Sequence, residues 1–243
     1  MKTIRIGNCL LINGDCQEVI KELEDNSITL IHTDPPYIIH SSGNIGSFME
    51  SKGGRKFYDG IVNADISDGF DVDVMFPEFK RVCKAINYQI WCSKKQFIDY
   101  LIMAKDNKWN WQDIHLFRNN PLPNVRGKYV DHDYLIHLWK GRTLTGTYHQ
   151  KILDYHYTIG GKKLYNHPAL KPLEPTLNLI AIGSDENDIV LDPFMGSGTT
   201  GEACLRQNRK FIGIEKNKDF FDIAYNRIKK VFNEINVSPN VDK

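Results

Sequence analysis

Short apolar runs alternate along the chain with longer segments in which apolar side chains recur every three or four residues. The apolar runs predict strands over residues 10–12, 28–32, 88–92, 134–139, 189–191 and 211–214. Several of them are apolar without alternation, as strands buried on both faces of a parallel sheet are. The periodic segments predict helices over residues 17–24, 72–84, 95–107, 175–183, 200–207 and 218–231. Strands that alternate with helices indicate an α/β domain with a largely parallel sheet.

Two irregular stretches interrupt this alternation. Residues 40–67 are rich in Gly and Ser, and residues 142–167 are rich in Tyr and His. Irregular stretches longer than about 15 residues inside a compact domain are usually functional or disordered. We therefore expect one domain over residues 1–243, with a flexible loop at 40–67 and a short insertion at 142–165.

The composition is that of a soluble globular protein, with 41% hydrophobic and 25% charged residues among 243. No run approaches the ~18 apolar residues of a membrane span, which leads us to expect a cytoplasmic protein. The five cysteines are scattered without a CxxC pair, as free thiols in a reducing compartment are. Neither they nor the eight histidines are spaced as metal ligands, so we expect no metal. The net charge of only +1 excludes a cationic surface overall, and a basic patch must be local.

The first informative motif follows an apolar strand, where Asp34, Pro35, Pro36 and Tyr37 stand in succession. In open α/β sheets, ligands bind at the carboxyl ends of strands. Prolines fix the backbone and remove N–H donors, which leaves the carbonyl groups beside Asp34 as acceptors on a stiff scaffold. A carboxylate, a rigid carbonyl and a flat ring suit recognition of an amino group on a planar base. The alternative is an Asx turn stiffened by proline, with a surface Tyr.

The second motif is a strand at 189–191 followed by Asp192, a glycine-rich turn with Gly196 and Gly198, and a helix. Glycines allow close backbone approach, and a helix N-terminus presents unpaired N–H groups. Glu215 ends the next strand 23 positions after Asp192, which is where an acid grips ribose hydroxyls in nucleotide-binding βαβ units. The missing third glycine disfavours NAD and FAD, and the missing Lys excludes a phosphate-binding P-loop. An ordinary strand, turn and helix is the alternative.

Together, the two motifs resemble those of the S-adenosylmethionine-dependent amino-methyltransferases of DNA. The tetrapeptide 34–37 matches the catalytic motif of that family, and residues 192–200 match its cofactor loop. Residues 13–16, 133–140 and 166–172 resemble three further family segments. The tetrapeptide precedes the glycine loop, which is the circularly permuted order of the β group. The resemblance covers most of the chain outside the two irregular stretches.

The resemblance implies a Rossmann-like methyltransferase fold with a mixed, mostly parallel seven-stranded sheet and helices on both faces. The whole chain is then a single catalytic domain, and 142–165 is a short target-recognition insertion. Asp15 would bind the adenine of S-adenosylmethionine, Glu215 its ribose, and residues 194–200 its methionine end. The full set of expected cofactor-binding residues is Asp15, Cys16, Asp34, Lys171, Asp192, Phe194, Gly196, Ser197, Gly198, Thr199, Thr200, Glu215 and Lys216.

The resemblance also implies a mechanism for the catalytic residues Asp34, Pro35, Pro36 and Tyr37. A base would be flipped out of the duplex, as enzymes that modify bases commonly require. Asp34 and the neighbouring backbone carbonyls would accept the two amino hydrogens, and Tyr37 would stack on the base, an interaction worth ~1–3 kcal/mol. The amine would then attack the sulfonium methyl group, and S-adenosylhomocysteine would be the product.

The identity of the methylated group stays open. Asp at the first position of the tetrapeptide is typical of adenine-N6 enzymes in the resembled family, whereas cytosine-N4 enzymes more often have Ser. The physical argument serves either amine, so adenine-N6 is expected and cytosine-N4 is the alternative. RNA, a protein amide and a binding module without catalysis are less favoured, the last because the tetrapeptide is intact.

Residues 118–171 contain nine Lys or Arg, three Asp and no Glu, a net charge of +6, with interleaved aromatic residues. This composition suits contact with phosphates and bases. The expected DNA-binding residues are Arg126, Lys128, Arg142, Lys151, Lys162 and Lys163. The expected partner is double-stranded DNA, and the resemblance also admits a homodimer and a separately acting cognate restriction endonuclease in a bacterial, archaeal or phage-infected cell.

Overall fold

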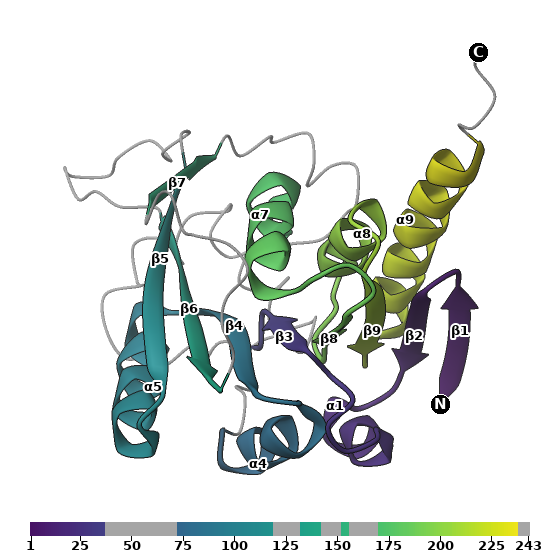
Figure 1. Cartoon of the computed structure of the whole chain (residues 1–243). Helices are drawn as coiled ribbons and strands as arrows, with labels where there is room; N and C mark the ends of the chain where they lie inside the picture. The colour runs from purple at the N-terminus through teal and green to yellow at the C-terminus, as the bar shows by residue number, and fades with distance from the viewer. Residues whose placement is uncertain (37–71, 119–131, 142–151, 156–169, 238–243) are drawn as a thin grey trace, which may run out of the picture.

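The fold is built on a nine-stranded mixed sheet in the order β1-β2-β9-β8-β3-β4-β6-β5-β7 (Figure 1). The computed structural model describes residues 1–36, 72–118, 132–141, 152–155 and 170–237. The strands are β1 (Lys2–Ile6), β2 (Cys9–Asn13), β3 (Leu30–Thr33), β4 (Ile86–Cys92), β5 (Asn110–Arg118), β6 (His132–Lys140), β7 (Ile152–Tyr155), β8 (Ile189–Asp192) and β9 (Lys210–Glu215).

Helices flank the sheet in two groups of three. They are α1 (Cys16–Val19), continued by the 3-10 turn η1 (Ile20–Glu22), α4 (Val72–Val82), α5 (Lys94–Asn107), α7 (Leu173–Gly183), α8 (Thr199–Arg206) and α9 (Lys218–Val237). In Figure 1, α7, α8 and α9 lie together in the upper part of the view, and α1, α4 and α5 lie in the lower part. Helix α5 begins with a capping box, in which Ser93 and Gln96 satisfy each other's backbone N–H groups.

Each group of helices covers one face of the sheet and buries a separate core. Successive side chains on a strand point to opposite faces, so Ile31 packs with Met75 and Phe79 of α4, whereas Leu30 packs with Ile180 of α7. The first core also takes Tyr100 of α5, and the second takes residues of α8 and α9. Burial on both faces explains why the inner strands are apolar without alternation.

Five neighbouring strands, β2, β9, β8, β3 and β4, run parallel to one another. Their carboxyl ends therefore meet at one edge of the sheet, which we call the carboxyl edge. The strands on either side of this block are antiparallel to it: β1 pairs with β2, and β6 pairs with β4. At this edge, the residues that leave β2, β3, β8 and β9 include Asp15, Asp34, Asp192 and Glu215, which sequence analysis predicts to be functional.

The predicted fold class is confirmed, but the sheet has nine strands among the described residues rather than seven. The two additional strands lie at its two ends, as β1 and β7. All six predicted strands are present, although the one predicted from Ile28 begins at Leu30 and Ile28 forms only an isolated bridge to Cys83. The prediction missed β1, β5 and β7. The helix predicted over 17–24 is shorter and changes to a 3-10 turn at Ile20.

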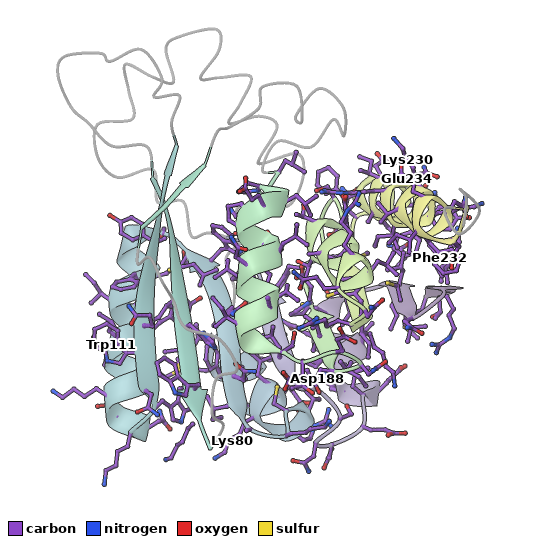
Figure 2. All side chains as sticks on the ribbon, turned by 45° about the horizontal axis from the view of Figure 1, so that its top comes forward. Lys80, Trp111, Asp188, Lys230, Phe232 and Glu234 are labelled. Atoms are coloured by element: carbon purple, nitrogen blue, oxygen red, sulfur yellow. The ribbon has the colours of Figure 1, made fainter. Side chains whose placement is uncertain are left out.

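Side chains near the two ends of the sheet differ in their surroundings (Figure 2). Trp111 of β5 is about half exposed on one side of the molecule, and Phe232 of α9 packs against the second core on the other. Within the described ranges, no helix is long and apolar enough to cross a membrane. The predicted loop at 40–67 lies wholly outside these ranges. Of the predicted insertion at 142–165, only residues 152–155 are described; they form β7 and pair with β5.

Candidate active site at the carboxyl edge

The two sequence motifs meet at adjacent strands in the middle of the sheet. Asp34 follows β3, and Asp192 ends β8, which pairs with β3 through Leu30↔Val190 and Ile31↔Leu191. Helix α8, which follows β8, packs in the second core, whereas α4, which precedes β4, packs in the first. Connections that diverge to opposite faces leave a crevice at the carboxyl ends of the strands, where α/β proteins bind ligands.

Asp34 is held by a lysine that lies far from it in sequence. Lys171 Nζ is 2.9 Å from Asp34 Oδ2, and the two side chains are 14% and 23% exposed. Lys171 stands just before α7, whose N-cap residue is Pro172. Pro35 is buried and Pro36 half-buried, which fixes the chain as it leaves β3. The predicted catalytic carboxylate and the predicted cofactor lysine are thus direct neighbours.

Asp192 connects the two motifs through its buried carboxylate. Oδ1 accepts hydrogen bonds from Thr33 Oγ1 at 3.0 Å and from the Phe194 N–H at 3.1 Å. Oδ2 accepts one from Thr200 Oγ1 at 2.6 Å. Burial raises the pKa of Asp192 to about 7, although the three donors lower it. Asp192 therefore fixes the residue before Asp34, the turn and the start of α8 relative to one another.

The raised pKa of Asp192 gives stability a pH dependence. The native-state pKa of about 7 lies above the ordinary 3.8, so between these values the native state binds more protons than the unfolded state. The contribution of this group to the free energy of unfolding is therefore full below pH ~4 and declines as the pH rises to ~7. We expect the stability of wild type relative to Asp192→Asn to decline over this range in urea unfolding. A constant difference would contradict the assigned pKa.

The glycine-rich turn between β8 and α8 uses left-handed backbone at two positions. Gly196 has a φ of 51° and Gly198, which caps α8, has a φ of 79°. The Gly196 N–H donates to Glu215 Oε2 at 2.9 Å, and the Asn217 N–H donates to Glu215 Oε1 at 2.8 Å. Burial raises the pKa of Glu215, whereas these backbone donors lower it. Glu215 thus closes the turn from the end of β9.

Gly198 is constrained by its neighbours as well as by its φ. A Cβ at this position would lie 3.0 Å from Ala224 Cβ and 3.1 Å from Ala224 Cα. We expect Gly198→Ala to lower the free energy of unfolding by about 2–3 kcal/mol, as strain at a left-handed position combined with a backbone clash does. Gly141→Ala is the matched control, because Gly141 has a φ of 77° but only Ala85 Cβ at 4.0 Å. Equal losses in denaturant titrations of the two variants would show that the clash contributes nothing.

The predicted adenine-binding residues lie beside Glu215 at the end of β2. Asn13 pairs in register with Glu215, and its Nδ2 donates to the Glu215 backbone oxygen at 2.8 Å. Asp15 Oδ1 accepts from the Gln17 N–H at 2.9 Å and caps α1, while Asp15 Oδ2 lies 3.6 Å from Lys216 Nζ. Burial raises the pKa of the Cys16 thiol to about 12, so it stays protonated.

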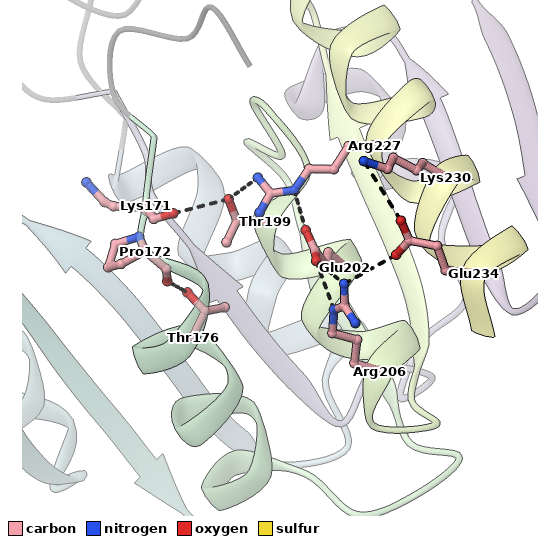
Figure 3. A network of polar contacts seen from close by, with 9 residues as sticks. All are labelled: Lys171, Pro172, Thr176, Thr199, Glu202, Arg206, Arg227, Lys230 and Glu234. Carbon is pink, nitrogen blue, oxygen red and sulfur yellow. Dashed lines mark hydrogen bonds and ion pairs between the residues drawn. The ribbon is translucent and has the colours of Figure 1, made fainter. Parts of the chain in front are cut away.

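A buried ion pair supports the start of α8 from α9 (Figure 3). Arg227 Nε donates to Glu202 Oε2 at 2.6 Å, and Arg227 Nη1 donates to Thr199 Oγ1 at 2.7 Å. Thr199 Oγ1 in turn donates to the backbone oxygen of Lys171 at 3.4 Å. The side chains of Arg227 and Glu202 are 3% and 5% exposed. This network joins the start of α8, after the glycine-rich turn, to the segment that carries Lys171.

The structure brings together most of the predicted site. The side chains of Thr199 and Thr200 are engaged by Lys171 and Asp192, which leaves backbone groups as the parts of these residues suited to a ligand. Ser197 is buried and Phe194 half-buried in the same turn. The predicted residues Tyr37, Arg126, Lys128, Arg142, Lys151, Lys162 and Lys163 lie outside the described residues. In the part of the chain that is described, no group of His, Cys, Asp and Glu is arranged to hold a metal ion.

Sequence reasoning missed three residues that shape this site. Thr33 reads as the last residue of a strand, and Arg227 reads as one of several charged residues on an amphipathic helix. Trp91, which lies under Lys171 with its ring centroid 5.1 Å from Nζ, reads as core. No local pattern distinguishes them, because each acts through a partner that is distant in sequence.

A family model described as DNA methylase, of the N6/N4 type, matches residues 75–226, more than half of the chain. The chain therefore belongs to the N6/N4 DNA methylase family, whose members are S-adenosylmethionine-dependent DNA amino-methyltransferases. The expected family, fold class and cofactor are confirmed.

Similar proteins span nearly the whole chain. The Type II methyltransferase M2.LlaDCHI of Lactococcus lactis subsp. cremoris is 28% identical, with 92% of this chain and 90% of that protein covered. The Type II methyltransferase M.HinfI of Haemophilus influenzae is 27% identical, with 95% and 70% covered. The solved M1.HpyAVI complex with S-adenosylmethionine has a TM-score of 0.63 at 27% identity and covers 90% of this chain and 99% of that one. The cytosine-N4-specific PvuII DNA methyltransferase has a TM-score of 0.67 at 17% identity, with 94% and 93% covered, a likeness of fold alone.

Proposed function

We propose that the protein transfers a methyl group from S-adenosylmethionine to the N6 amine of an adenine flipped out of double-stranded DNA. The observation that carries this proposal is the position of Asp34. It follows β3 directly, is paired with Lys171, and stands beside the cofactor turn through the Thr33–Asp192 hydrogen bond. An Asp at this position of the tetrapeptide is typical of adenine-N6 enzymes in the family.

Asp34 acts on the amino group of the base. Its carboxylate and the backbone carbonyl beside it accept the two amino hydrogens, which localises the nitrogen lone pair that is otherwise delocalised into the ring. Because Pro35 and Pro36 have no N–H, they cannot compete with the base for these acceptors. S-adenosylmethionine supplies an electrophilic methyl carbon on its sulfonium. Holding the two reactants in near-attack geometry contributes a large part of the rate enhancement.

The residues at the carboxyl edge fit this cofactor. The start of α8 offers backbone N–H groups next to glycines in left-handed conformations. Glu215 would hold the ribose hydroxyls, because the backbone donors of Gly196, Lys216 and Asn217 do not saturate a carboxylate, which offers about four acceptor sites. Asp15 and Cys16 would meet the adenine, with Lys216 beside them. Lys171 and the turn from Asp192 to Thr200 would meet the methionine end.

The proposed contacts with DNA involve Tyr37 and residues of the basic segment 118–171. Tyr37 would stack on the flipped base, and Arg126, Lys128, Arg142, Lys151, Lys162 and Lys163 would contact the duplex. Residues 142–165 would recognise the target, and the loop at 40–67 would lie near the DNA. By analogy with the Type II relatives, the enzyme would protect sites from a separate restriction endonuclease. Association as a homodimer is a further part of the proposal.

Product analysis tests the choice of base. Unmethylated duplex DNA is incubated with the enzyme and methyl-labelled S-adenosylmethionine, digested to nucleosides and separated by chromatography with mass detection. We expect the label in N6-methyl-2′-deoxyadenosine. Label in N4-methylcytosine would overturn the adenine assignment, and label in neither would overturn both. Modification-sensitive sequencing of DNA from expressing cells then gives the target sequence.

Glu215→Gln tests the cofactor assignment. The change keeps the size of the side chain but removes the charge that ribose hydroxyls would donate to, so we expect the Kd for S-adenosylmethionine to rise about tenfold. Isothermal titration calorimetry measures it. Glu186→Gln is the matched control, since Glu186 is exposed in the turn before β8, at the opposite ends of the parallel strands. An unchanged Kd for Glu215→Gln would contradict the assignment.

A further inference from the structure

Lys171 rests on a tryptophan whose orientation is set by a buried chain of hydrogen bonds. Trp91 lies on β4, is 1% exposed, and has its ring centroid 5.1 Å from Lys171 Nζ. A cation at this distance over an indole face is attracted by the ring, most strongly where water is excluded. The same ammonium contacts Asp34 Oδ2 at 2.9 Å. The ring and the carboxylate thus fix the ammonium from two directions.

The indole N–H of Trp91 is hydrogen-bonded within the core. It donates to His32 Nε2 at 3.2 Å, and His32 Nδ1 lies 2.8 Å from Gln89 Oε1. An indole nitrogen can only donate, so Nε2 of His32 is the acceptor and the ring proton sits on Nδ1, which donates to Gln89. Gln89 Nε2 then donates to the backbone oxygen of Leu179 at 2.7 Å. The donor and acceptor of each hydrogen bond from Trp91 to Leu179 are therefore assigned without conflict.

The buried environment keeps this assignment in place. Burial lowers the pKa of His32 to about 4, so the ring is neutral at physiological pH and Nε2 remains an acceptor for Trp91. His32, Gln89 and Trp91 are each at most 2% exposed. The His32 and Trp91 rings meet edge to face, with centroids 6.3 Å apart. The plane of the indole is therefore defined by hydrogen bonds as well as by packing.

The contacts that start at Lys171 end on the helix that follows it. Leu179 belongs to α7, and Lys171 precedes that helix by two residues. Gln89 binds the middle of α7, while Trp91, two residues further along β4, supports the lysine at its start. A strand places residues i and i+2 on the same face, so this arrangement follows from the pleat.

We propose that Trp91 is a positioning residue of the methyl-transfer site, which, with His32 and Gln89 behind it, holds the Lys171 ammonium beside Asp34. This role in methyl transfer rests on the proposed function, which assigns Lys171 to the cofactor and Asp34 to the base. The contacts themselves do not depend on which base is methylated.

A neighbouring network provides a matched control. Asn87 is on the same strand and face, is fully buried, and also binds α7, since its Nδ2 donates to the backbone oxygen of Gly183 at 2.8 Å. It donates as well to the Thr29 backbone oxygen, and its Oδ1 lies 2.8 Å from His137 Nε2. These contacts of Asn87, to Thr29, Gly183 and His137, do not include Lys171. Asn87→Leu therefore disturbs a buried network of the same kind without disturbing the lysine.

Chemical labelling of the full chain, without DNA or cofactor, tests the proposal. Trace acetic anhydride at fixed pH, followed by peptide mass spectrometry, gives the acetylation rate of Lys171 relative to Lys216, which is 66% exposed. We expect the ratio to rise about fivefold in Trp91→Leu and about twofold in Trp91→Phe, which keeps a ring but removes the N–H. Asn87→Leu should leave the ratio unchanged. An unchanged ratio in Trp91→Leu, or an equal rise in Asn87→Leu, would overturn the proposal.

Two further measurements distinguish this proposal from a loss of folding and from failure of the proposed function. Thermal unfolding establishes that each variant is folded at the labelling temperature, and if Trp91→Leu fails to fold, Trp91→Phe decides the outcome. In the methylation assay we expect the Trp91 variants to lose kcat with the KM for DNA unchanged, whereas Asn87→Leu keeps both. The labelling result stands even if the product is N4-methylcytosine, so failure of the proposed function and failure of this inference are distinguishable.

Discussion

Replacing Asp34 with Ala is expected to lower kcat for methyl transfer to duplex DNA by about a thousandfold, the upper range for loss of one preorganised electrostatic group. The variant loses the carboxylate that accepts the amino hydrogens and leaves Lys171 without the partner now 2.9 Å away. Transfer of a radiolabelled methyl group under single-turnover conditions measures the chemical step directly.

Asp25→Ala is the control for removing an aspartate. Asp25 is exposed, pairs with Arg81, and precedes β3 at the opposite edge of the sheet. Arg81 keeps Glu78 as a partner in that variant, so activity should be unchanged. Calorimetry distinguishes lost chemistry from lost binding, since Asp34→Ala should still bind S-adenosylmethionine through the Glu215 side of the site. Full activity in Asp34→Ala would contradict the mechanism.

The largest loss of stability is expected for Arg227→Met. Removing one member of a buried ion pair leaves the other charge without its partner in a low-dielectric site, which typically costs 3–5 kcal/mol. Glu202 keeps a second contact, from Arg206 Nε at 2.8 Å, so we expect the lower part of this range, about 3 kcal/mol. Urea unfolding measures the change.

Two variants check the origin of that loss. Lys218→Met on the same helix breaks the exposed pair with Asp222 and should leave stability nearly unchanged, because exposed ion pairs contribute little. Arg227→Met combined with Glu202→Leu removes both buried charges and should recover part of the loss, because an apolar pair of similar volume replaces a buried ion pair at little cost. A double variant that is less stable than Arg227→Met would show that other contacts of Glu202 dominate (Figure 3).

Much of the fold could be predicted from the periodicity of the inner strands and helices, because burial on two faces leaves an unbroken apolar signature. The missed strands lack it. Residues 3–6 alternate polar and apolar side chains, and the 110–118 strand carries Asn110, Gln112 and Asp113 within it. A strand that is covered on one face or lies near the sheet end needs no continuous apolar run, so composition does not reveal it. The count of seven strands came from the resemblance, and β1 and β7 extend the sheet beyond it.

The candidate site also contains residues that the sequence reveals and residues that it does not. The residues that follow strands at the carboxyl edge are recognisable, because Asp192 and Glu215 come directly after apolar runs and Asp34 follows one closely. The residues that hold them are not. Trp91 and His32 read as core, and their connection to Lys171 requires α7 to lie over β4. Such contacts arise only from the register of the strands, which no single segment of the sequence determines.

The interleaving of the chain in the sheet also governs how the protein is made. Asn13 and the Glu215 backbone oxygen that it binds are 202 residues apart in sequence, and β3 has β8 as its neighbour. During synthesis, β2 and β3 leave the ribosome long before β8 and β9, so their edges stay unpaired until most of the chain has emerged. Contacts of such sequence separation make folding slow, and open edges invite association between chains. The proposed cofactor site, whose residues run from Asp15 to Lys216, is therefore incomplete until most of the chain has emerged.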